Sequence, residues 1–162
     1  MTLATHIAIA AALTKPVAGA HPVLLFTAGL ASHYLSDAIP HWDYSMHSIG
    51  EKNNGNGRRW NFSRSSWFDI AKTALDYALG MALVLLVLEP HSSKEFVWIL
   101  IATTGGVLPD FLQALYLMKF KFLKPHQRFH DFMHTKIKLR SYPWIGIPFQ
   151  LLILGIFLYC IA

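Results

Sequence analysis

The most prominent feature of the chain is a series of long apolar segments separated by polar connections. Three of them cover residues 70–88, 96–118 and 143–162, and the last contains no charged side chain. A helix needs about 20 apolar residues to cross the hydrocarbon core of a bilayer, so each segment is long enough. A surface helix of a soluble protein would carry a polar face, and these segments lack one. The pattern therefore predicts membrane-spanning helices.

Two further apolar segments precede these three. Residues 22–40 are long enough to span, whereas residues 3–14 cover only about half of a bilayer core at 1.5 Å per residue. We expect the short segment to form a half-spanning or tilted helix that packs against the others. The sequence thus predicts a single all-α membrane-embedded domain over residues 1–162, an integral membrane helical bundle of about five helices.

Composition supports this class and excludes several others. Hydrophobic residues make up 54% of the chain and charged residues 14%, against about 25% charged in an ordinary soluble domain. The single cysteine, Cys160, lies in the last apolar segment, so neither a disulfide nor a thiolate metal site is expected. The chain has no nucleophile elbow, P-loop or dinucleotide fingerprint, and we expect no nucleic acid partner.

The positive charges gather in two connections. One, residues 44–68, contains the sequence NNGNG followed by Arg58, and reads as a flexible loop. The other, residues 119–142, carries seven Lys or Arg and a single acid, Asp131. The positive-inside rule places both in the cytoplasm, which predicts a multi-pass protein of the cell membrane with its C-terminus outside. Basic loops at a membrane surface favour anionic lipids as partners.

This orientation has a consequence for the ionisable residues. All the unusual ones fall at the cytoplasmic ends of the predicted helices, so we expect a metal site at one end of the bundle, facing the cytoplasm. The converging residues are His6, His33, Asp37, His41, Asp43, Asp69, Asp76, Asp110, His130 and His134.

The densest group lies in SHYLSDAIPHWD, residues 32–43. His33 and Asp37 are four residues apart, so on a helix they share one face about 6 Å apart and can bind one metal ion. Pro40 disfavours continuation of the helix and predicts a turn that returns His41 and Asp43 over the first pair. The alternative is a capped helix end among interfacial aromatic side chains.

Two carboxylates lie within apolar segments. A charged side chain there costs about 2.5–3.5 kcal/mol and needs a partner. Asp76 has Lys72 four residues before it, and a simple ion pair is one interpretation. Asp110 has no basic residue within a helical turn, so a metal ion or a histidine is the expected companion, with a structural hydrogen bond as the alternative.

Histidines supply the remaining candidates. His130 and His134 repeat the four-residue spacing, although a basic amphipathic helix at the membrane surface would produce the same pattern. His126 is a spare candidate, and His6 gains weight from the predicted convergence. The predicted non-ligands are His21, His47 and His91.

Imidazole and carboxylate ligands without thiolate suit a divalent metal, with zinc favoured and manganese or iron as alternatives, at one to three ions. The predicted metal ligands are His6, His33, Asp37, His41, Asp110, His130 and His134. Asp43, Asp69 or Asp76 would orient ligands or act as the general base. The expected activity is metal-assisted hydrolysis of a phosphoester in an anionic lipid or a lipid-linked phosphate substrate.

Two other functions fit the same residues. A protein that binds or transports metal ions or protons would spread such ligands through the depth of the membrane. A non-catalytic membrane protein would use a metal only to tie helices together, and would surround that metal completely with protein ligands.

The set of motifs resembles a family of small bacterial and archaeal membrane-bound proteins described as metal-dependent hydrolases. These are in turn similar to zinc-dependent phospholipase C and to the P1-type nucleases. The resemblance rests on Thr5-His6, on SHYLSDAIPHWD, on VLPD ending at Asp110, and on the histidines of HDFMH. It implies a membrane-bound hydrolase with a metal held by these residues.

Overall fold

The computed structural model describes residues 1–50, 59–137 and 139–162, so the predicted NNGNG loop and Arg58 lie outside the described residues. The described chain is built of helices, which confirms the predicted all-α class. Its α-helices are α1 (Leu3–Thr14), α2 (Pro22–Asp37), α3 (Arg64–Leu88), α4 (Ser93–Leu117), α5 (Lys124–Met133) and α6 (Pro143–Ile161). Short 3₁₀ turns are η1 (Lys15–Val17), η2 (Lys121–Leu123) and η3 (Leu139–Ser141). Two two-residue strands, β1 (Ile49–Gly50) and β2 (Arg59–Trp60), pair antiparallel.

The helix boundaries differ from the apolar segments in ways that local chemistry explains. The described part of the chain contains six α-helices where about five were expected, because the basic segment after α4 forms the additional helix α5. α2 ends at Asp37, three residues before Pro40, as the backbone restriction ahead of a proline requires. α3 begins several residues before its apolar segment, because Ser63 and Ser66 form a reciprocal capping box at its start.

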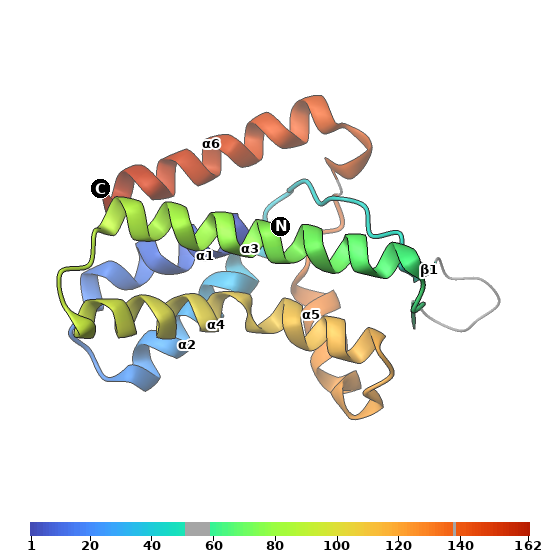
Figure 1. The fold of residues 1–162 in the computed structure, drawn as a ribbon, viewed down its shortest axis with the longest axis horizontal. Coiled ribbons are helices and arrows are strands. Elements are labelled where there is room, and N and C mark those ends of the chain that lie inside the picture. Colours follow the sequence, from blue (N-terminus) through green and yellow to red (C-terminus); the bar gives the residue numbers. More distant parts are fainter. Residues whose placement is uncertain (51–58, 138) are drawn as a thin grey trace.

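The short helix α1 lies at the centre of the bundle. It packs against α2, α3, α4 and α6 (Figure 1), and most of its side chains are buried. Small alanines allow the neighbouring helices to approach. Asp76 of α3 accepts hydrogen bonds from the backbone N–H groups of Leu3, at 2.6 Å, and Ala4, at 3.3 Å. A carboxylate of another helix therefore satisfies the first amides of α1.

Three helices, α3, α4 and α6, are long and apolar enough to cross a membrane. In the most apolar stretch of α3 only 17% of the residues are buried, and in that of α6 only 22%. Their exposed faces are apolar, which suits contact with lipid rather than water. These faces include Leu75, Leu79 and Leu86 on α3 and Leu151, Leu152 and Ile156 on α6. α2, with 16 residues, is shorter than these three spans.

Glycines bring α2 and α4 into close contact and so determine the position of His33. A Cβ atom on Gly29 of α2 would overlap the carbonyl oxygen of Ala102, and one on Gly105 of α4 would overlap that of Phe26. The backbones can therefore approach only because both positions lack a side chain. At this contact the imidazole Nδ1 of His33 lies 2.8 Å from the carbonyl oxygen of Gly106.

Candidate metal centre

Four side chains from three helices place their ligand atoms together. His33 and Asp37 come from the last turns of α2, Asp110 from α4, and His130 from α5. One ligand atom from each lies within 4.8 Å of all the others. His33, Asp37 and His130 are almost completely buried, whereas the side chain of Asp110 is 25% exposed.

The spacing of these atoms matches the edges of a metal coordination shell. Nε2 of His33 lies 3.3 Å from Nε2 of His130 and 3.3 Å from Asp37 Oδ2, and the latter two atoms are 3.4 Å apart. Asp110 Oδ1 lies 3.9 Å from Nε2 of His33 and 3.6 Å from that of His130. Tetrahedral zinc with ligands at 2.0–2.1 Å has ligand atoms about 3.4 Å apart.

A second group shares Asp37. Its other members are His41 and His134, whose Nε2 atoms lie 3.8 Å and 4.0 Å from the Asp37 carboxylate. The chain turns after α2, so that His41 comes back beside the helix end. Asp43 follows, with Oδ1 3.5 Å from His41 Nε2. The α-amino group of Met1 lies 3.1 Å from Asp37 and 2.9 Å from Asp43.

His6 reaches the same carboxylates from the central helix α1. Its Nε2 lies 3.2 Å from Asp37 Oδ1 and 3.8 Å from Asp110 Oδ2. Its ring is stacked on that of His33, with centroids 4.0 Å apart. The structure thus brings together the seven residues predicted as metal ligands, although it places His6 outside the two compact groups.

Each imidazole of this cluster uses its outer nitrogen for a protein partner. Three Nδ1 atoms face backbone carbonyl oxygens, which only accept, so these nitrogens carry the ring hydrogen. Ser36 donates its own hydroxyl hydrogen to the carbonyl of His33 and therefore accepts from His6. The four contacts are His33 with Gly106 O at 2.8 Å, His41 with Ile39 O at 2.7 Å, His134 with Thr135 O at 3.1 Å, and His6 with Ser36 Oγ at 3.0 Å.

This arrangement points the Nε2 atoms of the imidazoles at carboxylate oxygens. A neutral imidazole with its hydrogen on Nδ1 has only a lone pair on Nε2, and a carboxylate has only acceptors. Among the described residues, Nε2 of His6 and Nε2 of His41 are buried and have no hydrogen-bond partner. Metal-ligating histidines have this outer-nitrogen contact in nearly every case, so the cluster could hold a metal ion.

The charges of the cluster also shift the pKa values of two members, His130 on α5 and Asp43 in the connection after α2. Burial lowers the pKa of His130, but hydrogen bonds and attraction from Asp110 and Asp37 outweigh it and raise that pKa to about 9. Burial raises the pKa of Asp43, but His41 and the α-amino group of Met1 hold it below its ordinary value. A proton therefore occupies the position on His130 that a metal ion would take.

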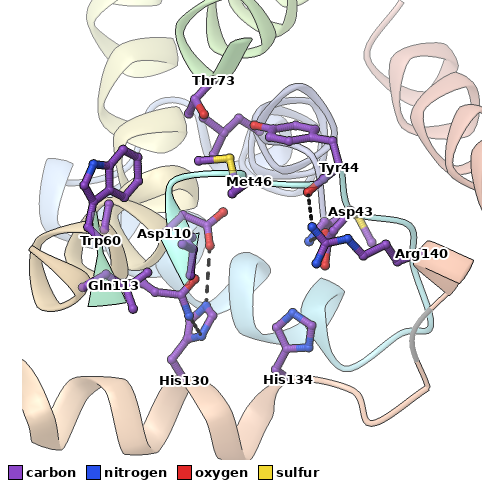
Figure 2. Close-up of a pocket in the computed structure, with 15 residues that line it drawn as sticks. Asp43, Tyr44, Met46, Trp60, Thr73, Asp110, Gln113, His130, His134 and Arg140 are labelled. Carbon is purple, nitrogen blue, oxygen red and sulfur yellow. Dashed lines mark hydrogen bonds and ion pairs between the residues drawn. The ribbon is translucent and has the colours of Figure 1, made fainter. Parts of the chain in front are cut away.

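A cavity of about 310 Å³ opens beside the cluster. Figure 2 shows Asp110, His130, His134 and Asp43 around it, with Asp110 directed at His130. The side chain of His134 is 20% exposed and that of Asp43 is 38% exposed. The part of the cluster nearest the cavity is therefore accessible to water and small molecules, while Asp37 and His33 lie behind it.

Four predicted site residues lie outside both groups. His6 and Asp43 contact group members, whereas Asp69 and Asp76 have other partners. Asp69 is buried and accepts hydrogen bonds from the amide and hydroxyl of Ser48, and it pairs with Lys72 at 3.2 Å. Asp76 accepts hydrogen bonds from the first amides of α1 and from the Tyr44 hydroxyl. The ion pair between Asp76 and Lys72, one interpretation of the sequence, is therefore not formed, and Lys72 pairs with Asp69 instead.

His126, the spare candidate, lies 3.3 Å from the Tyr34 hydroxyl and belongs to neither group. The predicted non-ligands His21, His47 and His91 also lie outside both groups.

Sequence reasoning missed residues that hold the ligands in place. Gln113 places its amide nitrogen 3.1 Å from His130 Nδ1, and the donor and acceptor of this contact depend on the tautomer of the ring. The available signal was its position three residues after Asp110, on the same face of an apolar helix. Ser36 gave no such signal, because its role depends on contact with α1.

The chain was compared with protein-family models, with curated proteins and with solved structures, and none of the three comparisons found a match.

Proposed function

We propose that the protein is a membrane-bound, metal-dependent hydrolase that cleaves a phosphoester in a lipid or lipid-linked substrate. The metal is zinc, with manganese or iron as the alternatives that the same ligands accept. The site faces the cytoplasm, where the basic connections attract anionic substrates.

One observation carries this proposal. Four imidazoles have Nδ1 engaged by a backbone carbonyl or a serine hydroxyl, and their Nε2 atoms face the carboxylates of Asp37, Asp43 and Asp110. Nitrogen and oxygen atoms spaced at 3.3–3.9 Å fit a divalent ion, and Asp37 is common to two groups. Two groups with a shared carboxylate support more than one ion, as enzymes that cleave phosphoesters often have.

The cavity favours hydrolysis over a purely structural metal. A structural site is closed by protein on all sides, whereas a catalytic site keeps one position for water or substrate. Asp110 and His134 have exposed atoms and line the cavity, so a ligand can enter between them. The gathering of the seven candidate ligands around Asp37 also disfavours a transport path, which would distribute them along the membrane depth.

The role proposed for each residue follows from its position in the site. A divalent ion bound in the cluster would supply Lewis-acid activation of water and of the phosphoryl oxygen. His33, Asp37 and His130 hold the buried side of the site. Asp43 lies at the cavity and is the residue placed to accept a proton from water. Asp76 anchors the start of α1 and so positions His6.

Turnover by the metal-loaded protein tests the proposal. Purified protein in neutral detergent is loaded with Zn²⁺ or Mn²⁺ and assayed with bis(p-nitrophenyl) phosphate and with a short-chain phospholipid. Hydrolysis should disappear with a chelator and fall at least 100-fold in Asp110→Asn. Asp131→Asn, on the exposed side of α5, is the matched control and should retain activity. Stoichiometric metal without turnover of either substrate would contradict the hydrolase assignment and favour metal binding or transport.

A further inference from the structure

The cavity beside the cluster has two chemically different walls. The metal-binding wall carries carboxylates and imidazoles. The other part of the lining is apolar and comes from the start of α1, residues 46 and 49, β2 and the end of α4. Its residues are Leu3, Met46, Ile49, Trp60 and Leu117. A cavity of about 310 Å³ with these walls fits a small amphiphilic molecule with a polar end at the metal cluster.

Among the described residues, one arginine and no lysine line this cavity. Arg140 belongs to η3, in the basic connection between α5 and α6, and Figure 2 shows its guanidinium beside Asp43 and above His134. Nε donates to Ser45 Oγ at 3.3 Å and Nη2 to the carbonyl oxygen of Tyr44 at 3.4 Å. Both acceptors follow Asp43 directly, so the segment that carries this carboxylate also positions the guanidinium.

The guanidinium keeps donors for a ligand. The two contacts use two of the five N–H groups of an arginine. In the described part of the chain, no carboxylate oxygen lies within 4.0 Å of the Arg140 nitrogens. A planar guanidinium that already contacts a fixed backbone binds phosphate oxygens with little further loss of side-chain freedom.

We infer that Arg140 binds the phosphate oxygens of an amphiphilic phosphoester in this cavity, while the apolar group of the ester lies along Leu3, Met46 and Ile49. The inference rests on the proposed function, because without bound metal the carboxylates of Asp43 and Asp110 would repel the phosphate. It assigns Arg140 a role in substrate binding. Metal binding itself does not require this residue.

Phosphate binding to the zinc-loaded protein tests this assignment. Isothermal titration with inorganic phosphate in neutral detergent compares wild type with Arg140→Ala, Arg140→Lys and the control Lys136→Ala, an exposed cation of the same connection. Arg140→Ala should weaken phosphate binding at least tenfold, and Arg140→Lys should weaken it less. Lys136→Ala should bind phosphate like wild type. Equal phosphate affinity of wild type and Arg140→Ala would overturn the inference.

Two further measurements separate the sources of failure. Metal content is determined on the same samples: absence of zinc from the wild type would overturn the proposed function, whereas zinc-loaded protein with no effect of Arg140→Ala overturns this inference alone. Butyl phosphate is titrated beside inorganic phosphate. The apolar wall predicts about tenfold tighter binding of the alkyl ester, since each buried methylene adds to affinity. Equal affinities would overturn the amphiphilic substrate and favour a soluble phosphate.

Discussion

At the scale of single residues, the imidazoles are oriented by what contacts their outer nitrogens. For His33, His41 and His134 this contact is a backbone carbonyl, which no substitution removes directly. For His130 it is the side chain of Gln113, which can be changed without touching a ligand. Gln113 is therefore the best place to test whether the outer contacts matter for metal binding.

Replacing Gln113 by leucine should lower zinc affinity about 10–100-fold, because the His130 ring loses the group that fixes its orientation and tautomer. Competition with a chromogenic zinc chelator measures this affinity. Gln127→Leu makes the same change on α5, where the amide bonds Asp131 rather than a ligand. Equal zinc affinities in the two variants would show that Gln113 does not support the site.

Protonation of His130 makes metal affinity depend on pH. Its pKa of about 9 in the metal-free protein means that its nitrogen carries a proton at neutral pH, and a metal ion must displace it. Zinc affinity should therefore rise with pH, about tenfold per unit for each proton displaced, and level off above pH 9. Chelator competition between pH 6.5 and 8 checks this. An affinity that is constant over that range would contradict the assignment of His130 as a ligand.

At the scale of elements, the contact between α2 and α4 determines the distance between His33 and Asp110. This contact depends on Gly29 and Gly105, where a side chain would collide with the opposite backbone. Two glycine positions thus set the spacing of the candidate metal site, three of whose residues lie elsewhere on the same two helices.

Leucine at Gly29 should separate α2 from α4 and abolish stoichiometric zinc binding while the helices persist. Gly155→Leu on α6 is the matched control, since a Cβ there would meet no atom within 4 Å. Zinc content and helical circular dichroism are measured together. If Gly29→Leu kept both its helicity and its zinc, the close helix contact would not be needed for the site.

The elements also show which features were predictable from the sequence. Hydropathy alone identifies α3, α4 and α6, because a membrane span depends on composition rather than on partners. The spacing of His33 and Asp37 predicts their shared face, because both lie on one helix. The role of Asp76 could not be predicted, because it depends on the start of a helix more than 70 residues away. The contact of Asp69 with Ser48 was likewise not predictable, because Ser48 lies in a connection 21 residues earlier.

At the scale of the whole molecule, the basic connections predict the orientation in the membrane. The segment formed by η2 and α5 carries Lys121 and the exposed Phe122 and Phe132, which suit a position at lipid headgroups. His130 of α5 belongs to the cluster, so the cluster lies on the same side of the membrane as α5.

Cysteine at position 121, in a chain whose native Cys160 is replaced by serine, reports this orientation. In intact cells Lys121→Cys should resist a membrane-impermeant thiol reagent and react only after permeabilisation. Cysteine at His91, in the α3–α4 connection, should react in intact cells. The reverse pattern would place the site outside the cell.

The central claim is that the His/Asp cluster binds metal, and the metal content of the purified protein tests it most directly. Detergent-solubilised protein is equilibrated with Zn²⁺, freed of excess ion and measured by elemental mass spectrometry, with His33→Ala and Asp110→Ala beside wild type and Asp131→Ala as control. We predict at least one zinc ion per chain in wild type and control, and a clear loss in both cluster variants. Wild-type protein without stoichiometric metal, or cluster variants that retain it fully, would contradict the account.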